Sequence, residues 1–157
     1  MKTIIVVGGS KGIGNALVKL LLHKYKVINI SRTKPEITHE NLEHFFCNVI
    51  ADDLPSIEKA DGLVYCPGSI NLKPILRLSI DDFKNDFEIN VLGAVRVIQK
   101  YLNVLKQGDK PSIVLFSTVA SKLGMPFHAS IATAKSGVEG LVKSLGAELA
   151  PTIRINA

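Results

Sequence analysis

The chain opens with TIIVV, from Thr3 to Val7, and continues with GGSKGIG, which ends at Gly14. The first run is apolar and β-branched, which predicts a buried strand. In the spacing Gly8-x-x-x-Gly12-x-Gly14, the first glycine permits a tight turn and the second lets backbone approach a pyrophosphate. The third lets a helix pack on the strand, and amides at the start of that helix would bind phosphate oxygens. The segment therefore predicts a dinucleotide-binding turn, whose other expected contacts are Ser10, Lys11 and Ile13.

Apolar runs alternate with amphipathic segments through the rest of the chain. Strands are expected at residues 3–7, 26–30, 43–46, 62–65, 112–117 and 153–156. Helices are expected at residues 13–23, 79–105 and 127–149, with a short helix around residues 54–59. This alternation predicts right-handed crossovers and an α/β fold, namely a Rossmann-type, doubly wound parallel sheet in three α/β/α layers. Residues 1–157 are expected to form one dinucleotide-binding domain.

Composition narrows the classes of function. The 157 residues suffice for one domain with a substantial core. The net charge of +5 is dispersed, which is typical of a solvated surface rather than a nucleic-acid-binding stripe. The apolar runs have the length of strands, so neither a signal peptide nor a membrane span is predicted. Cys47 and Cys66 form no C-x-x-C pair, and no disulfide framework or metal site is indicated. We expect a cytoplasmic protein that binds neither nucleic acid nor membrane.

The end of the second predicted strand bears on the choice of cofactor. An NAD site usually carries an acidic residue here, which bonds the ribose hydroxyls. This chain has Ser31 and Arg32 instead. A guanidinium at this place can hold a 2′-phosphate, and Lys11 of the glycine turn can assist it. The pattern favours NADP(H) over NAD(H); the alternative is that Arg32 is a solvated loop charge.

These motifs resemble those of the short-chain dehydrogenase/reductase family, and the resemblance covers essentially the whole chain. The turn is similar to the family's T-G-x-x-x-G-x-G motif, with Val7 in place of threonine. Asn48-Val49 resembles the Asp-Val pair that contacts adenine. The segment YCPG occupies the place of the Asn-Asn-Ala-Gly motif and keeps only its glycine, Gly68. Asn90 matches the helix asparagine of the family.

The resemblance also implies a catalytic set. Residues 112–121 resemble the strand that ends in the catalytic serine, which places Thr118 at that position with Ser117 beside it. Lys135 matches the catalytic lysine, which also bonds the nicotinamide ribose. In the family a Tyr-x-x-x-Lys pair shares one helix face, and the ammonium lowers the phenol pKa so that the phenol can exchange a proton. Here the tyrosine position is Ile131, which can neither donate nor accept a proton.

One candidate can replace the missing acid. His128 lies seven residues before Lys135 and therefore near the same helix face. A divergent enoyl-reductase branch of the family uses a tyrosine at that wider spacing, and an imidazole titrates near neutrality. The alternative is that His128 is a surface residue at the start of a helix, and Ser130 is a weaker candidate for the acid. Three further histidines share no motif and are expected to be solvated: His23, His39 and His44.

The resemblance implies an NADP(H)-dependent oxidoreductase that transfers hydride to or from a carbonyl or enoyl small molecule, with an atypical proton donor. Two alternatives are a non-catalytic NADP(H)-binding protein with a structural or redox-sensing role, and a truncated relic. The family typically assembles through its two long helices, so a homodimer or homotetramer is expected. The last residues have the pattern of a core strand, and the family's Pro-Gly motif, substrate loop and seventh strand do not follow; we expect a C-terminal part to be lacking.

Overall fold

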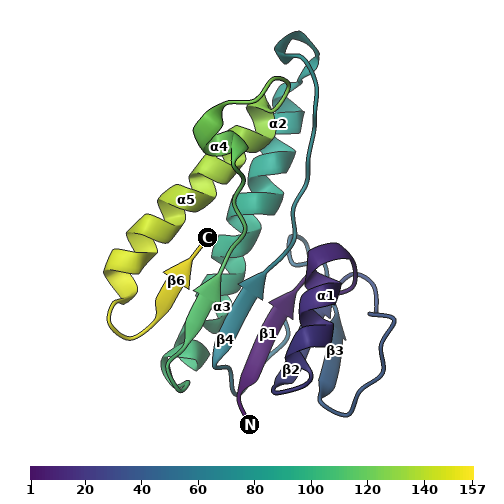
Figure 1. Ribbon diagram of the computed structural model, residues 1–157, viewed down its shortest axis with the longest axis vertical. Coiled ribbons are helices and arrows are strands. Elements are labelled where there is room, and N and C mark those ends of the chain that lie inside the picture. The colour runs from purple at the N-terminus through teal and green to yellow at the C-terminus, as the bar shows by residue number, and fades with distance from the viewer.

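A sheet of six parallel strands, in the order β3-β2-β1-β4-β5-β6, forms the centre of the computed structural model, which describes residues 1–157 (Figure 1). The strands are β1 Thr3–Val7, β2 Lys26–Ser31, β3 Leu42–Phe46, β4 Gly62–Tyr65, β5 Ser112–Val114 and β6 Arg154–Asn156. The order reverses between β1 and β4, and ligands of open α/β sheets bind at such a point, beyond the carboxyl ends of the strands. The predicted Rossmann-type fold is confirmed.

Helices cover both faces of this sheet (Figure 1). The α-helices are α1 Gly12–Leu21, α2 Ile80–Phe87, α3 Gly93–Lys106, α4 Ala120–Leu123 and α5 Ala129–Leu149. The structure also contains a 3-10 turn, η1 Ile75–Arg77, and a π-helical turn, η2 Glu88–Leu92. None of these helices combines the length and the apolar character needed to cross a bilayer.

The strand β1 shows how the two faces are filled, because its side chains alternate between them. Val6 packs in a small cluster with Val18 at α1 and with Leu22 just beyond it. Its neighbours Ile5 and Val7 point the other way, into the larger cluster that includes residues of α3 and α5. The result is three layers, with α1 on one side and α3 with α5 on the other.

Two predicted helices differ in the structure. The helix predicted at residues 79–105 is divided into α2, η2 and α3, because the side-chain amide of Asn90 donates to the backbone oxygen of Asp86, 2.8 Å away. The helix predicted at residues 54–59 does not form. Side chains of α3 instead bond backbone carbonyls in and just before this segment. Tyr101 donates to the carbonyl of Pro55, and the Arg96 guanidinium donates to the carbonyls of Val49, Ile50 and Asp52.

Candidate active site

The turn between β1 and α1 has the geometry of a phosphate site. Gly8 and Gly12 have φ angles of +78° and +54°, which favour glycine. A Cβ on Gly14 would lie 2.3 Å from the backbone oxygen of Gly8, so only glycine lets α1 begin this close to the turn. No side chain caps the N-terminus of α1, and its first turn holds no acidic residue. Its amides are therefore available to an anion.

A groove of about 700 Å³ runs from this turn across the carboxyl ends of β2 and β4. Eight residues predicted to bind the cofactor line it: Gly8, Ser10, Lys11, Ser31, Arg32, Asn48, Val49 and Gly68. The other predicted cofactor residues are not among its lining residues. Gly12, Ile13 and Gly14 begin α1, and Asn90 and Lys135 lie close to Gly68. Its walls also include residues that the sequence did not single out for this role: Thr33, Cys66, Pro67, Asn85, Glu88 and Ile89.

At the β2 end of the groove the two side chains predicted to hold a 2′-phosphate are both present. Lys11 and Arg32 are exposed and line the groove together. Ser10 and Thr33 connect their two segments through a hydroxyl–hydroxyl bond of 2.8 Å. Glu88, on η2, is the only acidic residue along the groove. This end of the groove therefore presents cations and hydroxyls.

A buried asparagine that the sequence analysis missed holds the glycine turn in place. Asn29 of β2 is fully buried, and its Oδ1 accepts from the amide of Gly9 at 2.9 Å. Its Nδ2 donates to Ser31 Oγ and lies 2.9 Å from Nδ1 of His44. The prediction that His44 is solvated is therefore wrong: its ring is partly buried, and burial lowers its pKa. The signal for Asn29 was a polar residue inside an apolar strand.

Asn90 and Lys135 meet at Gly68, beside the other end of the groove. A Cβ on Gly68 would lie 3.3 Å from Asn90 Oδ1 and 3.8 Å from Lys135 Nζ. The lysine comes from α5 and donates to the backbone oxygen of Phe116 at 2.7 Å, and burial lowers its pKa. Asn90 Oδ1 is buried and has no hydrogen-bond partner. A buried acceptor without a partner marks a place where a ligand or a water would bind.

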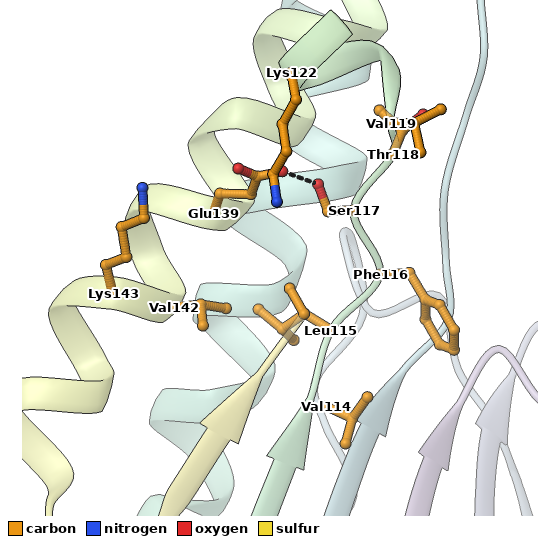
Figure 2. A pocket seen from close by; sticks show the side chains of 11 residues that line it. Val114, Leu115, Phe116, Ser117, Thr118, Val119, Lys122, Glu139, Val142 and Lys143 are labelled. Atoms are coloured by element: carbon orange, nitrogen blue, oxygen red, sulfur yellow. Dashed lines mark hydrogen bonds between the residues drawn. The ribbon is translucent and has the colours of Figure 1, made fainter.

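The two hydroxyl candidates after β5 have different surroundings. Ser117 Oγ donates to Glu139 Oε1 of α5 at 2.7 Å (Figure 2). Ser121 Oγ donates to the same oxygen at 2.6 Å. These two bonds lower the pKa of Glu139. Thr118 Oγ1 instead accepts from the amide of Ala120 at 3.3 Å. Ser117, Thr118 and Glu139 line a second hollow of about 580 Å³ between the end of β5 and α5.

The predicted replacement acid stands immediately before the first turn of α5. His128 precedes α5, and its Nδ1 donates to the backbone oxygen of Pro126 at 2.7 Å. With Lys73 and Phe127 it lines a further hollow of about 580 Å³, which is separate from the nucleotide groove. No hydrogen bond joins its ring to Lys135. Ile131, at the tyrosine position, is 4% exposed.

These residues fit a nicotinamide dinucleotide. Uncapped amides stand at the pyrophosphate position, cations and hydroxyls lie at one end of the groove, and an unpartnered amide oxygen with an ammonium group lies at the other. The histidine, cysteine and acidic side chains form no group that could hold a metal ion.

Comparison with known proteins agrees with this geometry. Residues 39–157 match the family model described as Enoyl-(Acyl carrier protein) reductase. The 2,5-dichloro-2,5-cyclohexadiene-1,4-diol dehydrogenase of Sphingobium indicum is 29% identical over 99% of this chain and 70% of its own length. The cyclopentanol dehydrogenase of Comamonas testosteroni is 24% identical over the same shares of the two chains. A solved short chain dehydrogenase family protein from Francisella tularensis superposes with a TM-score of 0.87, at 27% identity, over 99% of this chain and 67% of that one.

The family match covers most of the chain, and the named relatives are dehydrogenases. These findings confirm the resemblance drawn from the sequence and favour an enzyme over a non-catalytic binding protein. The chain therefore belongs to the short-chain dehydrogenase/reductase family and is an NAD(P)-dependent oxidoreductase.

Proposed function

We propose that this enzyme uses NADP(H) in preference to NAD(H), and that its proton donor is a residue other than 131. The observation that carries the cofactor assignment is the pair of cations, Lys11 and Arg32, at an end of the groove without a carboxylate. A guanidinium and an ammonium group bind a 2′-phosphate through charge-assisted hydrogen bonds, whereas an NAD site places an acid there.

Calorimetric titration with NADPH and with NADH tests this assignment. Loss of one charge-assisted bond costs about 1.5–3 kcal/mol, so Arg32→Ala should weaken NADPH binding by roughly 10- to 100-fold and leave NADH binding nearly unchanged. Lys24→Ala is the matched control, because Lys24 is exposed and does not line the groove. Equal affinity for the two cofactors, unchanged in Arg32→Ala, would refute the preference.

Each site residue has a separate proposed role in the reaction. Bound in the groove, NAD(P)(H) would give or take up the hydride. Lys135 would bond the nicotinamide ribose, and Asn90 would offer its free Oδ1 beside Gly68. Thr118, or its neighbour Ser117, would donate a hydroxyl hydrogen to the substrate oxygen. Ser117 already donates to Glu139, which leaves Thr118 as the hydroxyl with a free hydrogen.

His128 is the proposed proton donor. Its Nδ1–H donates to the backbone oxygen of Pro126, so Nε2 is the nitrogen that would exchange a proton with a substrate. A positioned acid contributes about 10²- to 10⁴-fold, and His128→Ala should lower turnover by that factor. The measurement is NADPH consumption over a panel of ketones and enoyl thioesters. Turnover that is indifferent to His128→Ala would exclude the histidine as the acid.

We also propose that the enzyme is a homo-oligomer that associates through α2 and η2. Ile80, Phe87 and Leu92 expose 71%, 40% and 51% of their surface there, although each is large and apolar. Such a surface favours a two-fold interface. Sedimentation at low micromolar concentration should give a dimer or tetramer, and Leu92→Glu should shift it toward monomer. A monomer in the unmutated protein would contradict this proposal.

A further inference from the structure

Asp86 of α2 is a fully buried carboxylate with no cationic partner. Its Oδ1 accepts from Ser69 Oγ at 2.5 Å and from Asn71 Nδ2 at 3.1 Å, and its Oδ2 accepts from Ser130 Oγ at 2.5 Å. The nearby Lys73 pairs with Asp82 instead. A buried carboxylate is costly unless its oxygens are hydrogen-bonded, so these three donors are what keep Asp86 in place.

The three donors come from two different parts of the chain. Ser69 and Asn71 belong to the loop after β4, and Ser130 belongs to the first turn of α5, the helix that carries Lys135. The carboxylate on α2 thus connects the loop after β4, which borders the nucleotide groove at Gly68, to α5, the helix that carries Lys135. Ser130 stands directly before Ile131, the position at which the family keeps its tyrosine.

A second set of bonds connects this cluster to Asn90. The Nδ2 group of Asn90 donates to Ser69 Oγ at 3.1 Å and to the backbone oxygen of Asp86 at 2.8 Å. Both amide hydrogens are therefore used on the Asp86 side, which leaves Oδ1 beside Gly68 without a hydrogen-bond partner. Ser69 accepts from Asn90 and donates to Asp86, so the carboxylate fixes the hydroxyl and the hydroxyl fixes the amide.

The local backbone agrees with a positioning role. The π-helical turn η2 begins two residues after Asp86 and contains Asn90. Single π-helical turns are less favourable than α-helix and are frequent at functional sites. The structure therefore holds Asn90 in an irregular turn and adds a buried side-chain network around it.

We propose that Asp86 is a positioning residue for the oxidoreductase reaction: through Ser69 it orients Asn90 toward the reacting end of the groove. Through Ser130 it also fixes the start of α5, where no tyrosine anchors the site. Asp86 itself does not contact substrate or cofactor. The inference rests on the proposed function only for its effect on turnover, because the orientation of Asn90 can be measured without a substrate.

Three substitutions separate the links of this network. Asp86→Ala removes the acceptor from all three donors. Asp86→Asn keeps an oxygen that accepts from Ser69 and Asn71, and it places an amide group beside Ser130 Oγ. The Ser130 hydroxyl can then donate to the backbone oxygen of Asp82, 3.2 Å away. Asp86→Asn should therefore retain the geometry. Ser69→Ala cuts only the connection between the carboxylate and Asn90.

The experiment measures turnover, KM, cofactor affinity and thermal unfolding in each variant, and follows hydrogen exchange of the Asn90 side-chain amide by NMR. A misplaced catalytic group costs about 10²-fold, so Asp86→Ala and Ser69→Ala should each lower turnover by roughly 10- to 100-fold, with cofactor affinity nearly unchanged. Their double mutant should be no worse than the poorer single mutant, because the two residues act in series. Asp86→Asn should rescue turnover. Ser136→Ala is the control, since Ser136 is exposed on α5 and bonds only the carbonyl of Ala132.

The amide exchange decides the inference even if the proposed function fails. In the wild type and in Asp86→Asn the Asn90 side-chain amide should be protected, and in Ser69→Ala and Asp86→Ala it should exchange faster. Unaltered amide protection and turnover in Ser69→Ala would overturn the inference. Loss of amide protection and turnover in Asp86→Asn would also overturn it, because the charge of Asp86 and not its hydrogen bonds would then be the cause. If Asp86→Ala does not fold, Ser69→Ala and Asp86→Asn decide the question alone. A wild type that turns over no substrate would refute the proposed function and leave the exchange result standing.

Discussion

Replacing Gly14 with alanine tests the close packing of α1 on the glycine turn. The new Cβ would lie 2.3 Å from the oxygen of Gly8 and 3.0 Å from two further backbone atoms. Carbon atoms pack best at about 3.5–4.0 Å, so α1 must move away from the turn by roughly 1 Å. Overpacking of this kind costs about 1–3 kcal/mol, and the higher helix propensity of alanine returns about 1 kcal/mol. We expect a net loss of up to about 2 kcal/mol in the free energy of unfolding.

Cofactor binding should suffer more than stability in Gly14→Ala, because the same movement displaces the first amides of α1. Loss of one hydrogen bond to a charged group costs about 1.5–3 kcal/mol, which predicts NADPH binding weaker by roughly 10- to 100-fold. Calorimetric titration and urea unfolding are the assays. Gly140→Ala is the control: no atom lies within 4 Å of its Cβ, so the helix α5 should gain up to about 1 kcal/mol and cofactor affinity should not change. Wild-type affinity in Gly14→Ala would refute the reasoning.

Three further predictions concern chemistry and pH. Ile131→Tyr should give carbonyl reductase activity, measured as NADPH consumption, because Lys135 lies one helical turn later; no gain would contradict this. Burial lowers the pKa of Lys135, so as pH rises the lysine loses its proton at a pH below the ordinary lysine value of 10.5. Turnover should fall at that pH, and a pH profile without such a decline would contradict this. Hydrogen bonds from Ser121 and Ser117 lower the pKa of Glu139. These bonds therefore contribute their full stability at pH values above the ordinary glutamate pKa of 4.5, and the contribution is lost as pH falls through the lowered pKa. Acid unfolding of Glu139→Gln should lack that contribution, and identical acid profiles would argue against it.

Local patterns predicted the first strand, the glycine turn and α1, because each depends on neighbours a few residues away. β1 has the predicted bounds, and Gly8 and Gly12 have the positive φ angles that the turn requires. The short helix at residues 54–59 was predicted from length and one proline. The helix does not form: side chains of α3, more than 40 positions along the chain, bond the carbonyl of Pro55 in that segment and three carbonyls just before it.

The Asp86 cluster lay beyond prediction for the same reason. Ser130 and Asp86 are 44 positions apart, and Ser69 joins them from a third element. An acidic residue one helical turn before Asn90 was the only local signal, and a charge on a helix is usually solvated. The sequence placed Thr118 at the position of the catalytic serine with Ser117 beside it, and in the structure the Ser117 hydroxyl is bonded to Glu139.

The central claim is that hydride transfer proceeds without a tyrosine at position 131. The most direct measurement is transfer of deuterium from NADPH labelled at nicotinamide C4, with unmutated enzyme and a panel of ketones and enoyl thioesters, followed by mass spectrometry of the products. The account predicts that at least one product carries the label and that its yield falls in His128→Ala. Tight NADPH binding with no label in any product would contradict it.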